Sequence, residues 1–102
     1  MISEQDRQEI DRVNQVLCDH FGVTVDDMKA RNKNRLCASV KSYALYYLHT
    51  QKGMSATTLS RAYKLHRRVV FNHVAKIKGY IEIYSTTRKE YEEICGLLNS
   101  IQ

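Results

Sequence analysis

The sequence contains no proline and no tryptophan, and only four glycines interrupt its 102 residues. Because proline and glycine are the residues that most often break helices, their scarcity favours a mostly helical protein. No run approaches the roughly 20 apolar residues that a membrane-spanning helix needs, and no basic segment followed by an apolar one opens the chain. The glycine-rich phosphate loop of nucleotide hydrolases is also absent. We therefore expect a cytoplasmic protein that makes no use of a membrane and has no ATPase activity.

Cysteine is scarce too, and its three copies (Cys18, Cys37 and Cys95) include no Cys-x-x-Cys pair. An odd number without such a pair argues against a disulfide framework or a zinc knuckle, so we expect packed thiols in a reducing compartment. His66 and His73 lie two helical turns apart, too far for a joint metal site. No acid pairs with a histidine or nucleophile in a catalytic pattern. We expect no metal, no cofactor and no enzymatic activity.

Acidic residues are absent from one long segment, and this is the most informative feature of the chain. Residues 29–78 hold twelve Lys and Arg and no Asp or Glu, giving a formal charge of +12. Residues 1–28 carry −5 and residues 79–102 carry −2, so the net charge of +5 conceals a segregation. An acid-free block cannot neutralise its charges with local ion pairs, and the positive field it projects attracts a polyanion. Nucleic acid is the leading partner.

Other interpretations of the acid-free block remain open. A solvated basic face would only aid solubility, although such faces usually mix both signs. A membrane-surface helix is disfavoured because the bases lie in several short segments separated by turns. An acidic protein partner would also be attracted by the same field.

The 43% hydrophobic composition is enough for the core of one domain, and the apolar spacing predicts an all-α fold. Ser3 and Gly22 bracket a first helix, and Thr24 opens a short turn through Met28. No apolar period runs through residues 29–37, which we interpret as a basic loop. The remaining helices are expected at about 39–51, 55–63, 66–84 and, capped by Thr87, 87–101, giving five to six in a single domain.

The short helix 55–63, a tight turn and the long helix from His66 have the layout of a helix-turn-helix. In that motif the second helix places its N-terminal residues against base edges in the major groove. Arg67 and Arg68 fall in the first turn, where a guanidinium can bind guanine in a bidentate fork, and Asn72 offers the amide that pairs with adenine. Two arginines at a helix start are also common as plain surface residues.

A known family shares this order of features. Residues 21–28 read Phe-Gly-Val-Thr-Val-Asp-Asp-Met and lead into a basic loop, a central helix and the helix-turn-helix. This arrangement, over about residues 13–77, resembles the C-terminal DNA-binding domain of the bacterial replication initiator DnaA. The family's run Gly-Gly-Arg-Asp-His-Thr-Thr-Val is replaced here by the shorter residues 64–70. The resemblance thus implies a way of docking on duplex DNA but not the base sequence recognised.

The resemblance also implies roles for particular residues. The family's base-reading positions fall on Arg67, Arg68 and Val69, and its minor-groove arginine falls on Arg35. Contacts to the DNA backbone would fall on Ser55 and Thr57, and the arginine that opens the family's central helix falls on Lys41. Together with the bases of the block, the candidate DNA-binding residues are Arg31, Lys33, Arg35, Lys41, Ser55, Thr57, Lys64, His66, Arg67, Arg68, Asn72 and Lys76.

We therefore expect a double-stranded DNA-binding protein, an accessory or regulatory factor of replication or transcription. One alternative is a protein-interaction domain that has kept the fold and lost DNA recognition. Another is a single-strand or RNA binder that stacks bases on Tyr43, Tyr46 and Tyr47, although this spacing is more typical of a core. The apolar stripe of helix 87–101 either folds back on the first helix or forms a homodimer seam.

Overall fold

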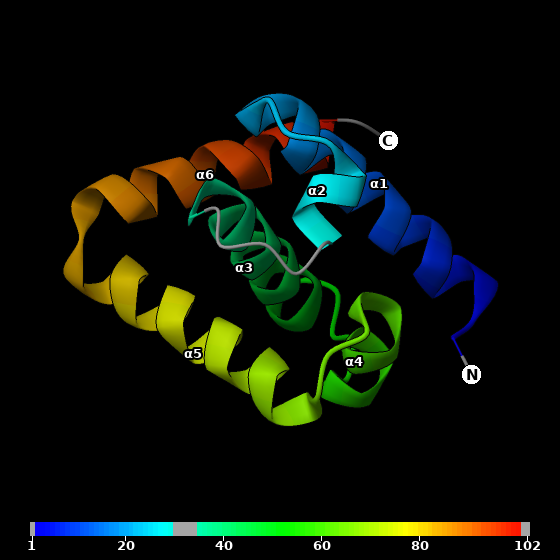
Figure 1. The fold of residues 1–102 in the computed structure, drawn as a ribbon. Helices are drawn as coiled ribbons and strands as arrows, with labels where there is room; N and C mark the ends of the chain where they lie inside the picture. The colour runs from blue at the N-terminus through cyan, green and yellow to red at the C-terminus, as the bar shows by residue number, and fades with distance from the viewer. Residues whose placement is uncertain (1, 30–34, 101–102) are drawn as a thin grey trace.

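The computed structural model describes residues 2–29 and 35–100, and these residues form six α-helices and no strand (Figure 1). The all-α prediction is confirmed. None of the described helices has the length and apolar character needed to cross a membrane. The helices are α1 (Glu4–Phe21), α2 (Val25–Lys29), α3 (Arg35–Thr50), α4 (Ala56–Tyr63), α5 (Arg67–Ile83) and α6 (Ser85–Ser100).

The predicted caps at the starts of three helices are confirmed. The Ser3 hydroxyl accepts a hydrogen bond from the Asp6 amide at 3.1 Å, and Thr24 accepts one from the Asp27 amide at 3.0 Å. Ser55 accepts from the Thr58 amide at 3.2 Å. Each cap satisfies an amide that has no partner inside the helix. At the other end of α1, Gly22 adopts φ +74°, the left-handed conformation that glycine takes without steric cost.

The predicted basic loop 29–37 is wrong at both ends. Lys29 is the last residue of α2, and α3 begins at Arg35, so residues 35–37 are helical; residues 30–34 lie outside the described residues. The first turn of α3 exposes Arg35 and Leu36 and buries only Cys37. A turn with one buried side chain shows no apolar period, which is why the sequence pattern failed to extend the helix there.

The predicted start of the last helix at Thr87 is also wrong. α6 begins at Ser85, separated from α5 by the single extended residue Tyr84 (φ −110°, ψ 119°). The Tyr84 carbonyl accepts a backbone hydrogen bond from the Arg88 amide at 3.2 Å, so the helix starts without help from Thr87. Thr87 instead lies half-buried within the first turns of α6.

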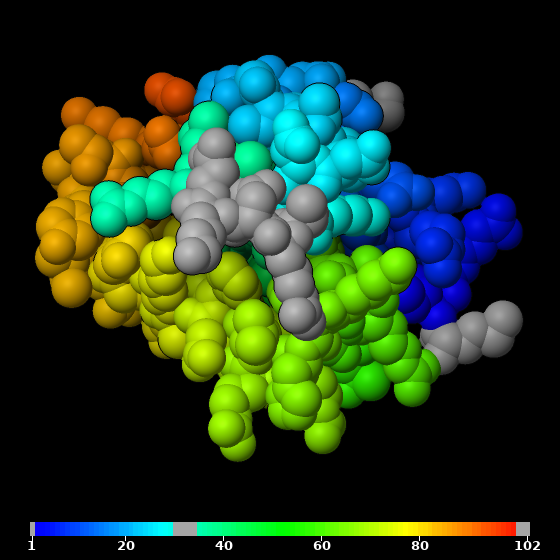
Figure 2. Space-filling view, in the orientation of Figure 1, coloured from blue at the N-terminus to red at the C-terminus, as the bar shows by residue number. Residues whose placement is uncertain are grey.

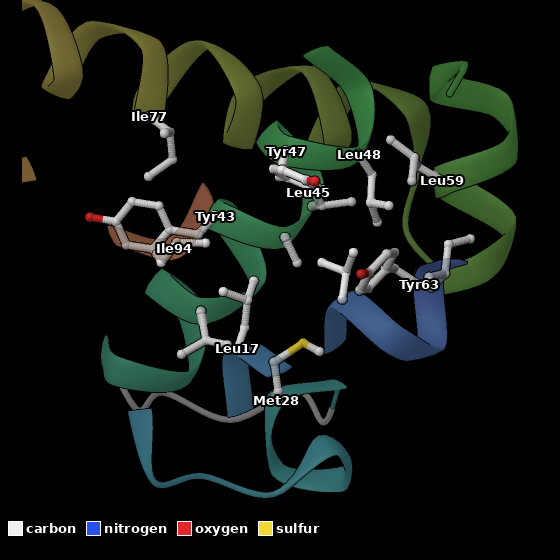
Figure 3. Close-up of a cluster of buried hydrophobic side chains, with 14 of the residues drawn as sticks. Leu17, Met28, Tyr43, Leu45, Tyr47, Leu48, Leu59, Tyr63, Ile77 and Ile94 are labelled. Atoms are coloured by element: carbon white, nitrogen blue, oxygen red, sulfur yellow. The ribbon is translucent and has the colours of Figure 1, made fainter. Parts of the chain in front are cut away.

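The core surrounds α3, which supplies nine buried residues. Figure 1 shows α3 enclosed by the other helices, a position that suits a segment with apolar residues on most of its sides. Figure 3 shows side chains from every other helix meeting around it, including Leu17, Met28, Leu59, Ile77 and Ile94. Burying an aliphatic side chain of this size contributes about 1.5–3 kcal/mol, so α3 organises most of the stability of the domain.

α6 folds back on the same chain, one of the two arrangements left open by its apolar stripe. Tyr91, Ile94 and Leu98 are buried in the core. The Arg12 guanidinium of α1 donates a hydrogen bond to the Leu98 carbonyl at 2.9 Å, and it also pairs with Glu9 at 2.6 Å. These contacts fasten the last helix to the first.

A buried polar contact fixes α4 against α1. The Tyr63 hydroxyl donates a hydrogen bond to the Asn14 side-chain carbonyl, and both side chains are buried, Asn14 being 1% exposed. The Asn14 amide nitrogen has no partner among the described residues. The Tyr63 hydroxyl is therefore the donor that satisfies the buried Asn14 carbonyl.

The serine–histidine contact between Ser42 and His73 joins α3 to α5. The Ser42 hydroxyl and His73 Nδ1 lie 2.6 Å apart, and Ser42 also donates to the Ala38 carbonyl at 2.9 Å. Burial, followed by the nearby Lys41 and Lys76 ammonium groups, lowers the pKa of His73. The imidazole is therefore kept neutral at the seam that holds α5 in place.

We expect the Tyr63→Phe substitution to destabilise the domain by about 1–3 kcal/mol, because it leaves the buried Asn14 carbonyl without a donor. Urea denaturation monitored by circular dichroism measures the change. Tyr80→Phe is the matched control, since Tyr80 is 43% exposed and should give a change near zero. Equal effects of the two substitutions would contradict the role of the Asn14–Tyr63 contact.

Stability should also depend on pH through His73. The lowered pKa means that the unfolded chain binds this proton more readily than the folded one, so folding free energy is lost as the pH falls below about 6.5. Denaturation curves between pH 5 and 8 should show this loss, and His73→Gln should flatten it. His20→Gln, at an exposed position, is the control; an unchanged pH profile in His73→Gln would refute the assignment.

Candidate nucleic-acid interface

The turn between α4 and α5 comprises residues 64–66 and is built from backbone and side-chain caps. The Lys64 and Leu65 amides both donate to the Ser60 carbonyl, the latter at 2.9 Å, which ends α4. His66 begins α5, with its Nδ1 accepting a hydrogen bond from the Arg68 amide at 3.1 Å. The predicted DNA-binding residue His66 is thus exposed, but one of its ring nitrogens already serves as a cap.

Lys64 occupies an unfavourable backbone conformation. Its φ of 55° makes it the one non-glycine residue with positive φ among the described residues. This conformation costs a residue with a Cβ about 1–2 kcal/mol, and glycine is the usual choice at such a position. The exposed lysine side chain is therefore held at this corner at a cost in stability.

Three exposed residues of α5 line one side of the helix. Arg68, Asn72 and Lys76 are spaced by four residues, so they lie one above another. Asn72 and Lys76 border a shallow groove of about 130 Å³. Arg67 is also exposed but points about 100° away from Arg68 around the helix, towards the side of Phe71. The helix therefore groups Arg68, rather than Arg67, with Asn72 and Lys76.

The structure brings Arg35 close to this row. Arg35 and Lys76 line one pocket of about 530 Å³ between α3, α5 and α6, which Tyr80 and Thr87 also border. The Lys76 ammonium group lies 5.9 Å from the centre of the Tyr80 ring, a cation–π distance. Two bases far apart in the sequence thus share one part of the surface.

Lys41 differs from the other candidates because it is not on the open surface. Its side chain is only 9% exposed, and burial lowers its pKa. It lines a second pocket together with Lys29 and Lys64. Lys41 therefore reaches solvent only through that pocket.

The remaining candidates are distributed around α4 and beyond it. Ser55 and Thr57 are exposed at the start of α4, and the Ser55 hydroxyl is engaged by the cap and by the Thr58 hydroxyl at 3.0 Å. Arg31 and Lys33 lie outside the described residues. Two further exposed bases, Lys29 and Arg61, were singled out by no motif, and Lys29 lines a pocket with Lys64. The signal that includes both is the acid-free block itself.

The bases of α4, the turn and α5 have no acidic partners among the described residues. The two ion pairs among the described residues lie elsewhere: Glu9 of α1 binds Arg12 at 2.6 Å and Lys52 at 3.6 Å. Figure 2 shows the face on which α2, α4 and the first half of α5 meet, with side chains of the α4–α5 segment projecting along its lower edge. We call the set Arg35, Lys64, Arg68 and Lys76 the basic face.

The tyrosines considered for base stacking are engaged in the core instead. Tyr43 and Tyr47 are buried, and Tyr46 packs edge-to-face on Tyr91 with ring centres 5.0 Å apart. Cys18, Cys37 and Cys95 all lie in the described part of the chain and form no disulfide there, and the first two are buried. Across residues 2–29 and 35–100, no group of three or more His, Cys, Asp or Glu side chains is placed to hold a metal ion.

Comparison with known proteins adds no identification. No protein-family model matches this sequence. No curated protein matches it either.

Proposed function

We propose that this protein binds double-stranded DNA, with the N-terminal part of α5 in the major groove and α4 and the turn against the backbone. The observation that carries the proposal is the basic face: its bases come from α3, the turn and α5, and none of those in the turn and α5 forms an ion pair with a described residue. A surface of unpaired bases is the usual electrostatic signature of a nucleic-acid-binding protein.

The arrangement of α4, the turn and α5 supports the duplex over other polyanions. A helix of eight residues, a three-residue turn and a helix of 17 residues are the parts from which a helix-turn-helix is made. Arg68 and Asn72 have the side chains that recognise guanine and adenine edges in the major groove. Similarity of the sequence to the DNA-binding domain of DnaA suggests the same docking mode, with Arg35 directed to the minor groove.

Local energetics point the same way. Arg67 and Arg68 stand at the positive end of the α5 dipole, where a base is unfavourable, and no acidic residue occupies that first turn. Lys64 is held in a conformation better suited to glycine. Residues that lower the stability of a fold are characteristic of functional surfaces. Binding of a DNA phosphate would offset both the unfavourable position of the two arginines and the backbone strain at Lys64. The proposed role is that of an accessory or regulatory factor of replication or transcription that acts by binding duplex DNA.

Duplex binding should be measured by fluorescence anisotropy across a salt series, with duplexes selected from random DNA and scrambled ones. We expect the logarithm of the association constant to fall by about 0.9 per phosphate contact for each log unit of salt. Arg68→Ala should cost about 1–3 kcal/mol on the selected duplex and much less on the scrambled one. Lys76→Ala should weaken both equally.

Lys78→Ala is the matched control for these substitutions. Lys78 is an exposed base of the same helix, but it lies on the side of Phe71, away from Arg68, Asn72 and Lys76. Replacing Lys78 should lower the affinity for both duplexes only slightly and should leave the preference for the selected duplex unchanged. Absence of duplex binding at low salt would refute the proposed function. Binding of an acidic protein partner that persists in the presence of excess duplex DNA would favour the alternative of a protein-interaction domain.

Lys64→Gly should separate stability from binding. Removing the side chain relieves the left-handed strain, so the free energy of unfolding should rise by about 0.5–1 kcal/mol. Loss of the charge should reduce the salt slope of duplex binding by about 0.9. Lys64→Ala keeps the Cβ and therefore should lose binding without gaining stability. A Lys64→Gly protein less stable than the parent would contradict the assigned backbone strain.

A further inference from the structure

A second site lies beside the basic face. It is a pocket of about 540 Å³ bordered by α2, α3 and the end of α4, within the volume range of small-molecule sites. Figure 2 shows the region where α2 and α4 approach each other on this face of the molecule. The residues that line it are Asp26, Lys29, Lys41, Ala62, Tyr63, Lys64 and Leu65.

Lys41 is the unusual member of this lining. More than nine-tenths of its side chain is buried, because α3 is enclosed on most sides. It has no hydrogen bond or ion pair with a described residue, and Asp26 of the same pocket does not approach it within ion-pair distance. The part of Lys41 that is buried is mainly its aliphatic stem, because the ammonium nitrogen is not one of the fully buried polar atoms without a partner. Burial still lowers the pKa of Lys41, so a ligand that pairs the ammonium group would stabilise its charge. The pocket is the place from which a ligand could pair it.

The charges of the lining define the ligand. Among the described residues of the lining, three ammonium groups (Lys29, Lys41 and Lys64) stand against one carboxylate, Asp26, which is a formal excess of two positive charges. A phosphate monoester carries about −1.5 to −2 at neutral pH, whereas each phosphate diester of a nucleic-acid backbone carries −1. The monoester therefore matches the pocket more closely than the backbone does.

The rest of the lining offers an apolar wall. Ala62 and Leu65 are partly buried and pack against the core, while the Tyr63 hydroxyl is turned away to Asn14. The pocket is larger than a phosphate ion needs, so an organic group has room against this wall. We propose that this pocket binds the phosphate monoester of a small molecule, with Lys29, Lys41 and Lys64 holding the phosphate. The pocket stands on its own geometry, so this proposal does not rest on duplex binding.

Isothermal titration calorimetry tests the proposal, with inorganic phosphate and adenosine monophosphate as probes at constant ionic strength. We expect saturable binding of both, with none of adenosine. Lys41→Met, which keeps the shape of the side chain and removes its charge, should weaken binding about ten- to hundredfold. Lys78→Met, an exposed base outside the pocket, should leave it unchanged.

The folding of Lys41→Met can be checked independently. Because burial lowers the pKa of Lys41, the folded state is destabilised by its charge, and the methionine variant should melt at a higher temperature than the parent. If that variant nevertheless fails to fold, Lys29→Met at an exposed position replaces it, with the same loss of binding expected.

Three results would overturn the proposal. The first is that neither probe gives a saturable heat of binding. The second is a loss of phosphate affinity in Lys78→Met as large as that in Lys41→Met, which would indicate attraction by the general positive field of the protein. The third is unchanged phosphate binding in a folded Lys41→Met protein, which would show that the Lys41 ammonium group does not hold the phosphate. If the protein binds phosphate but no duplex DNA, the phosphate-pocket proposal is supported and the proposed duplex binding is not.

Discussion

The burial of α3 is the constraint on which the rest of the structure depends. All the other described helices contribute side chains to the core around it, and α6 reaches it through the Tyr91 ring, which lies against Tyr43 and Tyr46. Packing of α5 on α3 also brings Arg35 and Lys76 to one pocket at the surface. The hydrophobic core and the basic face are thus two results of the same packing.

Polar side chains lie at the boundary between the hydrophobic core and the basic face. Ser42 and His73 bridge α3 and α5, and Lys41 stands beside them with little solvent. Apolar contacts are not directional and tolerate small shifts of α5 along α3. The hydrogen bond between Ser42 and His73 is directional and forms in only one relative position of the two helices. His73 borders the same groove as Asn72 and Lys76, so the orientation of these two side chains depends on the neighbouring contact with Ser42.

Local signals predicted most of the helices because the chain marks their ends with short-range chemistry. Ser3, Thr24 and Ser55 cap helices through hydrogen bonds that span only three residues, so the sequence contains all the information needed. The starts of α3 and α6 were missed for the opposite reason. Arg35 and Ser85 begin helices whose first turns are mostly exposed, and packing of the later turns is what extends them.

Helical periodicity, capping and composition act within a few residues, which is why the all-α class and the segregation of charge can be predicted without coordinates. Tertiary structure alone decided which bases meet. Lys29, Lys41 and Lys64 share a pocket only because α2 and α4 pack on α3, and Lys41 is buried although lysine is one of the residue types most rarely found buried. Such distances between remote residues are set by the fit of the core side chains, which no local pattern encodes.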